Sequence, residues 1–186
     1  LAVYTFVFSV VFNARWSTAN ESKMEFALVL FAGLIVFNLF SECVNRAPSL
    51  ILSNVNYVKK VVFPLEILPI VAFGSAFFHM LASLFVWLIC YAIFFGMPSA
   101  SALLLPLILL PLALIVVGLS SILASLGVYL RDVSQLVGTL TTALMFLSPI
   151  FYPASALPLE YQKILVINPL FPIIEQVRGV LMKGDM

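Results

Sequence analysis

Long runs of apolar residues, separated by a few short polar segments, make up most of this sequence. Of its 186 residues, 63% are hydrophobic and only 9% are charged, and the mean hydropathy is +1.19. Ordinary soluble domains carry about 25% charged residues. Because about 20 consecutive apolar residues cross the hydrocarbon core of a bilayer as a helix, the pattern predicts an all-α, polytopic bundle of membrane helices.

Five apolar runs are predicted to be membrane spans of a single transmembrane domain that covers residues 1–186. The first run rises only about 18 Å as a helix, which is less than the hydrocarbon thickness of about 30 Å. No basic stretch precedes it, so we interpret it as the tail of a span rather than a signal peptide. We expect the N-terminal region and the last span to be missing from this chain. The predicted spans cover about 1–12, 26–43, 67–95, 102–128 and 136–152.

Prolines are expected to shape the second half of the chain. Pro106 and Pro111 lie inside the fourth predicted span, where neighbouring helices can satisfy the carbonyls that a proline frees, and we expect a kink at each. After residue 152, four further prolines leave pieces that are too short to cross a bilayer, such as 159–167 and 173–182. We predict short re-entrant or interfacial helices there.

Residues 45–63 have a different pattern, because apolar residues repeat at helical spacing on one face and Ser, Asn and Lys repeat on another. This predicts an amphipathic helix on the membrane surface, with Pro48 in its first turn and its end before Pro64. On periodicity alone, Lys59 and Lys60 would extend to lipid phosphates, and Glu66 would cap the following helix.

The predicted spans place the loops alternately on two sides. One side holds residues 13–25, 96–101 and the region after 152, and the other holds 44–66 and 129–135. Basic residues near span ends set the orientation of membrane proteins. The first side has Arg15, Lys23 and Lys163, and the second has Arg46, Lys59, Lys60 and Arg131, so the second side is predicted to be cytoplasmic.

The residues that could do chemistry form no recognisable catalytic pattern. The sequence has no nucleophile with a nearby base, no cluster of metal ligands and no phosphate-binding glycine loop. His79 has no carboxylate close to it in the sequence, and we predict a structural hydrogen bond between helices rather than a proton relay. Cys43 and Cys90 are expected to be small hydrophobes rather than a disulfide or metal pair. The nearly balanced charge gives no basic face for nucleic acid.

Four short motifs add a family resemblance. They are N-V-N-Y-V-K-K-V-V-F-P-L-E-I-L-P at 54–69, G-V-Y-L-R-D-V-S-Q at 127–135, L-S-P-I-F-Y at 147–152 and N-P-L at 168–170. In this order, and on this pattern of spans, the chain resembles the permease subunits of ABC-2 type exporters. It is most similar to those that export O-antigen, capsule or teichoic-acid polymers, and the resemblance covers essentially the whole chain.

The resemblance implies a permease of six spans that forms a homodimer in the bacterial cytoplasmic (inner) membrane. Each protomer would rest on a separate ABC ATPase subunit, which would bind ATP and Mg, whereas this chain would bind no cofactor or metal. The permease would move a lipid-linked polysaccharide through the bilayer without being an enzyme itself. No nucleic-acid partner is expected.

The resemblance also assigns roles to residues. The segment between the second and third spans would contact the ATPase or form a cytoplasmic gate, together with the loop after the fourth span. The external gate would follow residue 152, with Phe151 and Tyr152 near the exit of the glycan path. For Arg131, Asp132 and Gln135, helix capping and a local ion pair are an equally good interpretation. The coupling or gate residues are Asn56, Tyr57, Lys59, Lys60, Phe63, Pro64, Glu66, Arg131, Asp132 and Gln135.

Two alternatives stay open at this stage. One is an exporter of the same family that carries a drug or a small lipid. The other is an intramembrane enzyme that acts on polyprenyl-linked sugars, which would need catalytic acids or bases. The spans are almost bare of such groups, since Glu42 and Glu66 lie only at span ends.

Overall fold

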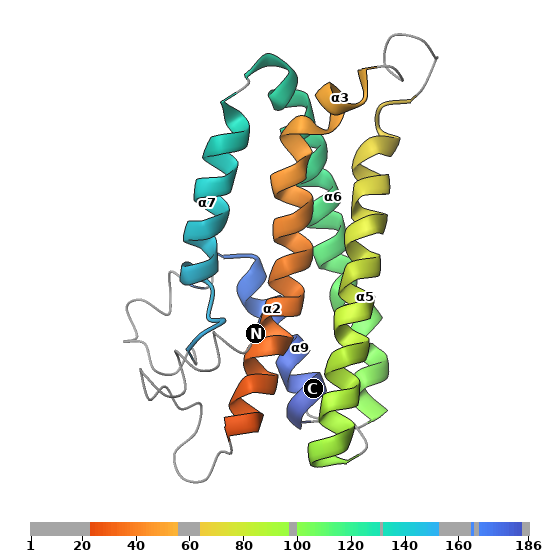
Figure 1. The fold of residues 1–186 in the computed structure, drawn as a ribbon, viewed down its shortest axis with the longest axis vertical. Helices are drawn as coiled ribbons and strands as arrows, with labels where there is room; N and C mark the ends of the chain where they lie inside the picture. Colours follow the sequence, from red (N-terminus) through yellow and green to blue (C-terminus); the bar gives the residue numbers. More distant parts are fainter. Residues whose placement is uncertain are drawn as a thin grey trace.

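The computed structural model describes residues 23–55, 64–96, 100–130, 132–152, 165 and 168–183. Every regular element in these ranges is helical, which confirms the predicted all-α membrane bundle. Figure 1 shows an elongated bundle in which long helices lie beside shorter ones. The long helices are α2 (Lys23–Arg46), α5 (Ile67–Phe95) and α6 (Leu105–Tyr129), and the shorter ones are α7 (Val133–Leu147) and α9 (Leu170–Arg178).

Within the described ranges, three helical stretches are long and apolar enough to cross a membrane. They are Met24–Ser53, Ile67–Phe95 and Ser101–Tyr129, and each has at least 29 residues, which rise more than about 40 Å as a helix. These stretches contain the predicted spans 26–43, 67–95 and 102–128. The predicted span at 1–12 lies outside the described residues.

The helix of the fifth predicted span is shorter than expected. We predicted a helix up to Tyr152, but α7 ends at Leu147 and its 15 residues rise only about 22 Å. The reason is Pro149, which disfavours helical geometry at the residue before it, and Ser148 is indeed extended, with φ −85° and ψ 141°. Phe151 and Tyr152 therefore do not mark the interfacial end of a helix.

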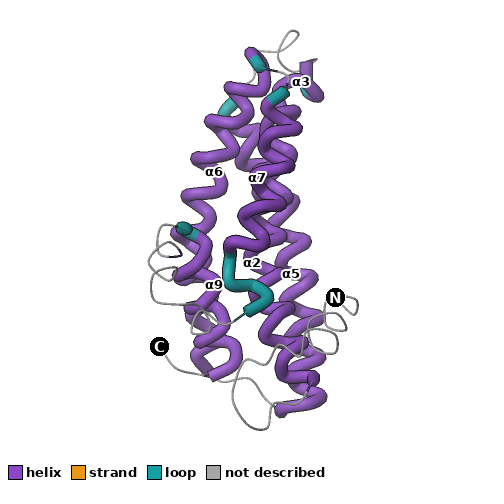
Figure 2. Tube along the Cα trace, turned by 90° about the vertical axis from the view of Figure 1, so that its left-hand side faces the viewer, coloured by secondary structure: helices purple, strands orange, loops and turns teal. Residues whose placement is uncertain are grey.

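The lower half of the bundle beneath α7 is occupied by α9, as Figures 1 and 2 show. A π-helical turn, η5 (Gly179–Lys183), continues α9. These elements cover the short helix predicted at 173–182. Because α9 packs against α2 and α6 and buries Ile173, Ile174 and Val177, it is a helix inside the bundle.

Pro106 has a different role from the one predicted. It lies in the first turn of α6, where its missing N–H and fixed φ suit helix initiation, so it does not kink a helix interior. The preceding residues form a 3-10 helix, η3 (Ala100–Leu104). Pro111 does lie inside α6.

The predicted amphipathic helix at 45–63 is broken in its described part. α2 continues through Arg46, and a 3-10 turn, η2 (Ala47–Ser49), carries Pro48 in its first positions. The four-residue α3 (Leu50–Ser53) follows and ends where Asn54 leaves helical geometry. Residues 56–63 lie outside the described part. After Pro64, α5 begins at Ile67, as predicted.

The centre of the bundle is α2, which packs against α5, α6, α7 and α9. Its Leu30, Ala32 and Val36 are almost fully buried. Trp87 of α5 is also fully buried, and its indole N–H donates to the carbonyl of Leu28 at 2.9 Å. This bond ties α5 to α2, because a buried indole N–H needs an acceptor.

Candidate functional site

Two loops that the sequence analysis assigned to one side of the membrane meet at one end of the bundle. In Figure 1, α3, the beginning of α5, the end of α6 and the beginning of α7 lie together at the top, and we call this the α3 end. Here η2 packs against α6. The close approach depends on Gly127, because a Cβ there would collide with the backbone of Pro48.

The described members of the predicted coupling surface are exposed at the α3 end. Glu66 occupies the N-cap position of α5 and Asp132 that of α7, and neither side chain makes a capping hydrogen bond. An acidic group at a helix N-terminus still interacts favourably with the helix dipole. The positions of Glu66 and Asp132 therefore also agree with the capping interpretation. Pro64 and Gln135 are exposed too. Outside the described residues lie Asn56, Tyr57, Lys59, Lys60, Phe63 and Arg131, whose roles stay predictions.

The predicted exit residues, Phe151 and Tyr152, lie in the non-helical segment that follows α7. Phe151 is only 2% exposed, and its ring centroid is 6.0 Å from that of Phe146. The hydroxyl of Tyr152 donates to the carbonyl of Phe146 at 3.2 Å. Phe151 is therefore a core residue in this chain, and only Tyr152 is partly exposed.

A buried arginine holds the break after α7 in place. Arg178 of α9 donates to the carbonyls of Pro149 at 2.6 Å, Ile150 at 2.8 Å and Val29 at 3.2 Å. Its side chain passes close to Gly33 of α2, where a Cβ would collide with the guanidinium. The non-helical segment after α7 thus obtains its hydrogen bonds from α9, as irregular backbone at membrane depth must.

Asn168 makes a second connection between the same segments. Its side-chain amide donates to the hydroxyl of Ser148 at 2.9 Å, and its side-chain oxygen accepts from the backbone N–H of Leu170 at 3.0 Å. The second bond satisfies an otherwise unpaired donor at the beginning of α9. This explains the N-P-L motif: the asparagine closes the helix start and Pro169 favours its geometry.

We expect Asn168→Ala to destabilise the start of α9. Losing a side-chain acceptor at a helix N-terminus typically lowers stability by about 1 kcal/mol, and the bond to Ser148 is lost as well. Hydrogen exchange in detergent should show faster exchange at Leu170 and Phe171 than in the unmodified protein. Asn54→Ala is a matched control at the α3 end, because the Asn54 amide bonds only within its own turn. Equal exchange at Leu170 in the two variants would contradict the assignment.

The most unusual surface of the bundle is the exposed side of α2. In the most apolar 18 residues of Met24–Ser53, the stretch that contains α2, 72% of the residues are buried. The corresponding share is 11% for Ile67–Phe95 and 22% for Ser101–Tyr129. What α2 leaves exposed or half-exposed toward the α3 end is polar and repeats at positions i, i+3, i+4, i+7 and i+8 of one helix face. We call it the polar stripe: Asn38, Ser41, Glu42, Asn45 and Arg46.

Most of the large side chains that α5 and α6 expose are apolar. On α5, Phe78 is 69% exposed and Ile93 is 71% exposed, and on α6, Leu114 is 68% exposed. Such faces suit lipid. Polar and ionisable groups in membrane helices instead face a bundle interior or a water-filled cavity. The polar stripe therefore suits a bundle interior or a water-filled cavity, whereas the apolar faces of α5 and α6 suit lipid.

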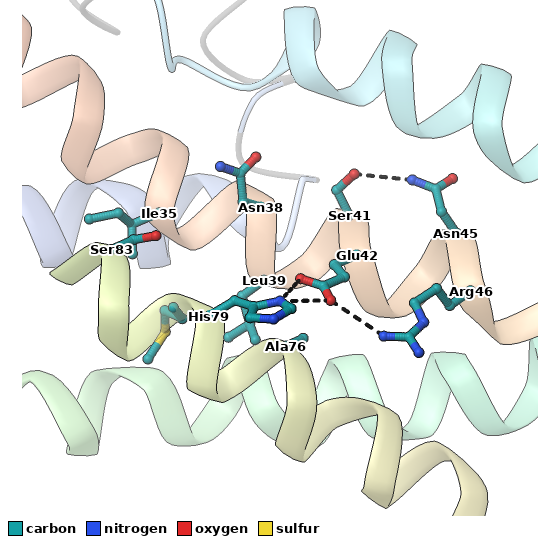
Figure 3. A pocket seen from close by; sticks show the side chains of 11 residues that line it. Ile35, Asn38, Leu39, Ser41, Glu42, Asn45, Arg46, Ala76, His79 and Ser83 are labelled. Carbon is teal, nitrogen blue, oxygen red and sulfur yellow. Dashed lines mark hydrogen bonds and ion pairs between the residues drawn. The ribbon is translucent and has the colours of Figure 1, made fainter. Parts of the chain in front are cut away.

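An ion-paired cluster lies between the polar stripe and α5 (Figure 3). Nδ1 of His79 lies 3.0 Å from both carboxylate oxygens of Glu42, and Nη1 of Arg46 lies 3.4 Å from Oε1 of Glu42. The hydrogen bond between α5 and α2 confirms the prediction made for His79. The cluster borders a groove of about 410 Å³ between the two helices, which is also lined by Asn38 and Ser83.

The sequence analysis missed this groove, although a signal was present. The stripe residues have helical spacing, but Asn38, Ser41 and Glu42 lie near the end of the predicted span 26–43, whereas Asn45 and Arg46 lie in the loop predicted at 44–66. The partner of His79 lies 37 positions away in the sequence, so only the fold brings the two together. Arg178 was missed in the same way. Among the described residues, no group of three or more His, Cys, Asp or Glu could hold a metal ion.

Long apolar helices packed around the central α2 define a multi-pass membrane protein of the all-α class. The family model that matches residues 1–182 is described as "ABC-2 type transporter". The chain belongs to the ABC-2 type transporter family. Members of this family are the transport subunits that pair with an ABC ATPase.

Curated relatives make the comparison more specific. The chain is 26% identical over 184 residues to the O-antigen export system permease protein RfbA of Klebsiella pneumoniae, covering 98% of this chain and 68% of that protein. It is 25% identical over 182 residues to the O-antigen export system permease protein RfbA of Myxococcus xanthus, covering 97% and 67%. The resemblance found in the motifs is thus confirmed over nearly the whole chain.

Proposed function

We propose that this chain is the transmembrane domain of an exporter that moves a lipid-linked polysaccharide across the bacterial cytoplasmic membrane. The polar stripe of α2 is the observation that supports this most directly. A glycan is rich in hydroxyl groups and needs hydrogen-bonding partners throughout its passage, and the stripe offers them beside α5 and α6, most of whose large exposed side chains are apolar. The names of the curated relatives support the same substrate class.

In this proposal two copies of the permease form the path, and a separate ATPase subunit supplies the energy. The α3 end is the cytoplasmic face. Closure of the ATPase subunits moves η2 and α3, and the movement passes directly to α6, because η2 and α6 are in contact. The permease itself makes and breaks no covalent bond.

Export in cells tests this function. The full-length gene is expressed with the gene of the proposed ABC ATPase partner in a strain whose own O-antigen permease is deleted but whose glycan synthesis is intact. We expect surface polysaccharide to return and intracellular lipid-linked glycan to fall. Persistent intracellular glycan, together with ATP-dependent efflux of a drug or a small lipid from vesicles, would instead establish the alternative exporter.

The coupling role of the loop residues is tested by a triple variant, Lys59→Ala, Lys60→Ala and Glu66→Gln. We expect it to retain ATP hydrolysis but to export at least tenfold less polymer, because the charged contacts that transmit movement are gone. The control changes Lys23→Ala and Glu25→Gln at the opposite end of α2. Unchanged export by the triple variant would refute the coupling role.

A further inference from the structure

We propose that the groove between α2 and α5 binds a neutral, polyhydroxylated sugar unit of the exported substrate, with Glu42 and His79 as its hydrogen-bonding centre. This inference rests on the proposed function and adds a binding site to it. The site is the groove of about 410 Å³ that the ion-paired cluster borders, seen from close by in Figure 3.

The polar groups of the groove are available to a ligand. His79 is 61% exposed, the side chain of Arg46 is 53% exposed and that of Glu42 is 28% exposed. An ionised carboxylate can only accept hydrogen bonds, so Nδ1 of His79 donates to Glu42 and Nε2 remains for another partner. The groove therefore presents the imidazole nitrogen of His79, the guanidinium of Arg46 and the side-chain amide of Asn38. The amide supplies both a donor and an acceptor.

The arrangement of charge favours a neutral ligand over a phosphate. Glu42 lies between the two basic groups, 3.0 Å from Nδ1 of His79 and 3.4 Å from Nη1 of Arg46. A phosphate that approached either base would also approach this carboxylate and be repelled by it. A sugar hydroxyl both donates and accepts hydrogen bonds and carries no charge. It can therefore bond to the carboxylate, the guanidinium or the amide without electrostatic repulsion.

The rest of the lining fits the other face of a sugar ring. Leu39, Ala76 and Met80 form an apolar part of the groove, against which the C–H groups of a sugar can pack. Its volume lies within the range of about 300–1,000 Å³ that is typical of small-molecule sites, which combine apolar walls with a few placed polar groups. The groove therefore suits a short stretch of glycan.

Thiol labelling tests the proposal in the full-length permease–ATPase complex, reconstituted in nanodiscs. Cys43 and Cys90 are first replaced by alanine, and one cysteine is then introduced by Asn38→Cys in the groove. Ser121→Cys is the matched control, since Ser121 is exposed on α6 outside the groove. A charged methanethiosulfonate reagent reacts with thiolates in water, and we expect it to label position 38 at least tenfold faster than position 121.

Two probes then separate the sugar from the lipid headgroup. Lipid-linked glycan extracted from the strain that carries the permease is expected to slow labelling at position 38 at least fivefold, whereas polyprenyl phosphate without glycan is expected to leave it unchanged. Equal labelling at the two positions, or protection by polyprenyl phosphate alone, would overturn the proposal. A glycan that stimulates ATP hydrolysis and is exported but gives no protection would overturn it too, while leaving the proposed function intact.

A conservative variant provides a second measurement. Glu42→Gln preserves the shape of the side chain but loses its charge, and we expect the glycan concentration for half-maximal ATPase stimulation to rise at least fivefold. The maximal rate and the melting temperature should stay as they are. A half-maximal concentration equal to that of the unmodified protein would show that Glu42 and His79 only join α2 to α5.

Discussion

The Arg178→Met variant is expected to be less stable than the unmodified protein by about 3 kcal/mol, because two backbone carbonyls lose their donor in the interior of the bundle. A buried polar group left without a partner destabilises a protein by roughly 1–3 kcal/mol. The carbonyls of Pro149 and Ile150 lie in the non-helical segment after α7, and Arg178 donates to both. Methionine fills a similar volume but donates nothing.

The loss also weakens the connection between α9 and the segment that follows α7. Among the described residues, Arg178 and Asn168 make side-chain hydrogen bonds between these two parts. α7 and α9 together cover the length of the bundle in Figure 1, and the break between them is where Arg178 binds. We therefore expect the variant to exchange the amide protons of residues 148–152 faster. A lysine in place of Arg178 should recover only part of the stability, because its single ammonium cannot reproduce the planar guanidinium fork.

Thermal unfolding in detergent measures this effect. For a protein of this size, 3 kcal/mol corresponds to a fall in melting temperature of roughly 6–12 °C. Glu175→Gln is the matched control, because Glu175 lies 3.5 Å from Nη1 of Arg178 and its side chain is 41% exposed. Because the Glu175 side of this pair reaches solvent, Glu175→Gln is expected to lower stability less than Arg178→Met does. Equal melting temperatures for Arg178→Met and Glu175→Gln would contradict the role given to Arg178.

The spans could be predicted from the sequence because they depend on local properties. The beginning of α5 at Ile67 and its end at Phe95 follow from the adjacent Pro64 and from Gly96, whose φ of +88° favours glycine. Where the prediction erred, a proline acted differently from expectation: Pro149 ended α7 early, and Pro106 began α6 instead of kinking it.

The candidate site was harder to predict from the sequence than the spans, because it depends on contacts between segments that are distant in the sequence. Arg178 donates to Val29, 149 positions away, and His79 contacts Glu42, 37 positions away. No pattern within one helix reveals such pairs. The sequence did contain a hint in each case, since an ionisable residue within an apolar helix usually marks a partner or a cavity.

The α3 end provides the second large effect. Gly127 belongs to the G-V-Y-L-R-D-V-S-Q motif, and the structure explains its glycine. A Cβ at this position would meet the carbonyl oxygen, carbonyl carbon and Cα of Pro48, all of them backbone atoms. Backbone cannot turn aside as the end of a long side chain can, so any larger residue must push η2 away from α6.

We expect Gly127→Ala to lower stability by about 1–3 kcal/mol, as overpacking of a buried contact usually does, and Gly127→Val to lower it further. Gly118→Ala in the same helix is the matched control, because no atom lies within 4 Å of the Cβ it would add. There the change should stabilise the helix by roughly 0.5–1 kcal/mol, since alanine is the better helix former. The two substitutions are chemically identical, so opposite shifts in melting temperature would isolate the contact with Pro48.

The same pair of variants connects stability to transport. If η2 passes movement from the ATPase to α6, Gly127→Ala should reduce polymer export per ATP hydrolysed, whereas Gly118→Ala should leave that ratio unchanged. Export can be measured as surface polysaccharide and hydrolysis as phosphate release from the same reconstituted complex. A Gly127→Ala protein that is destabilised but still couples normally would assign Gly127 to packing alone, and would move the coupling path from η2 to the beginning of α5 or α7.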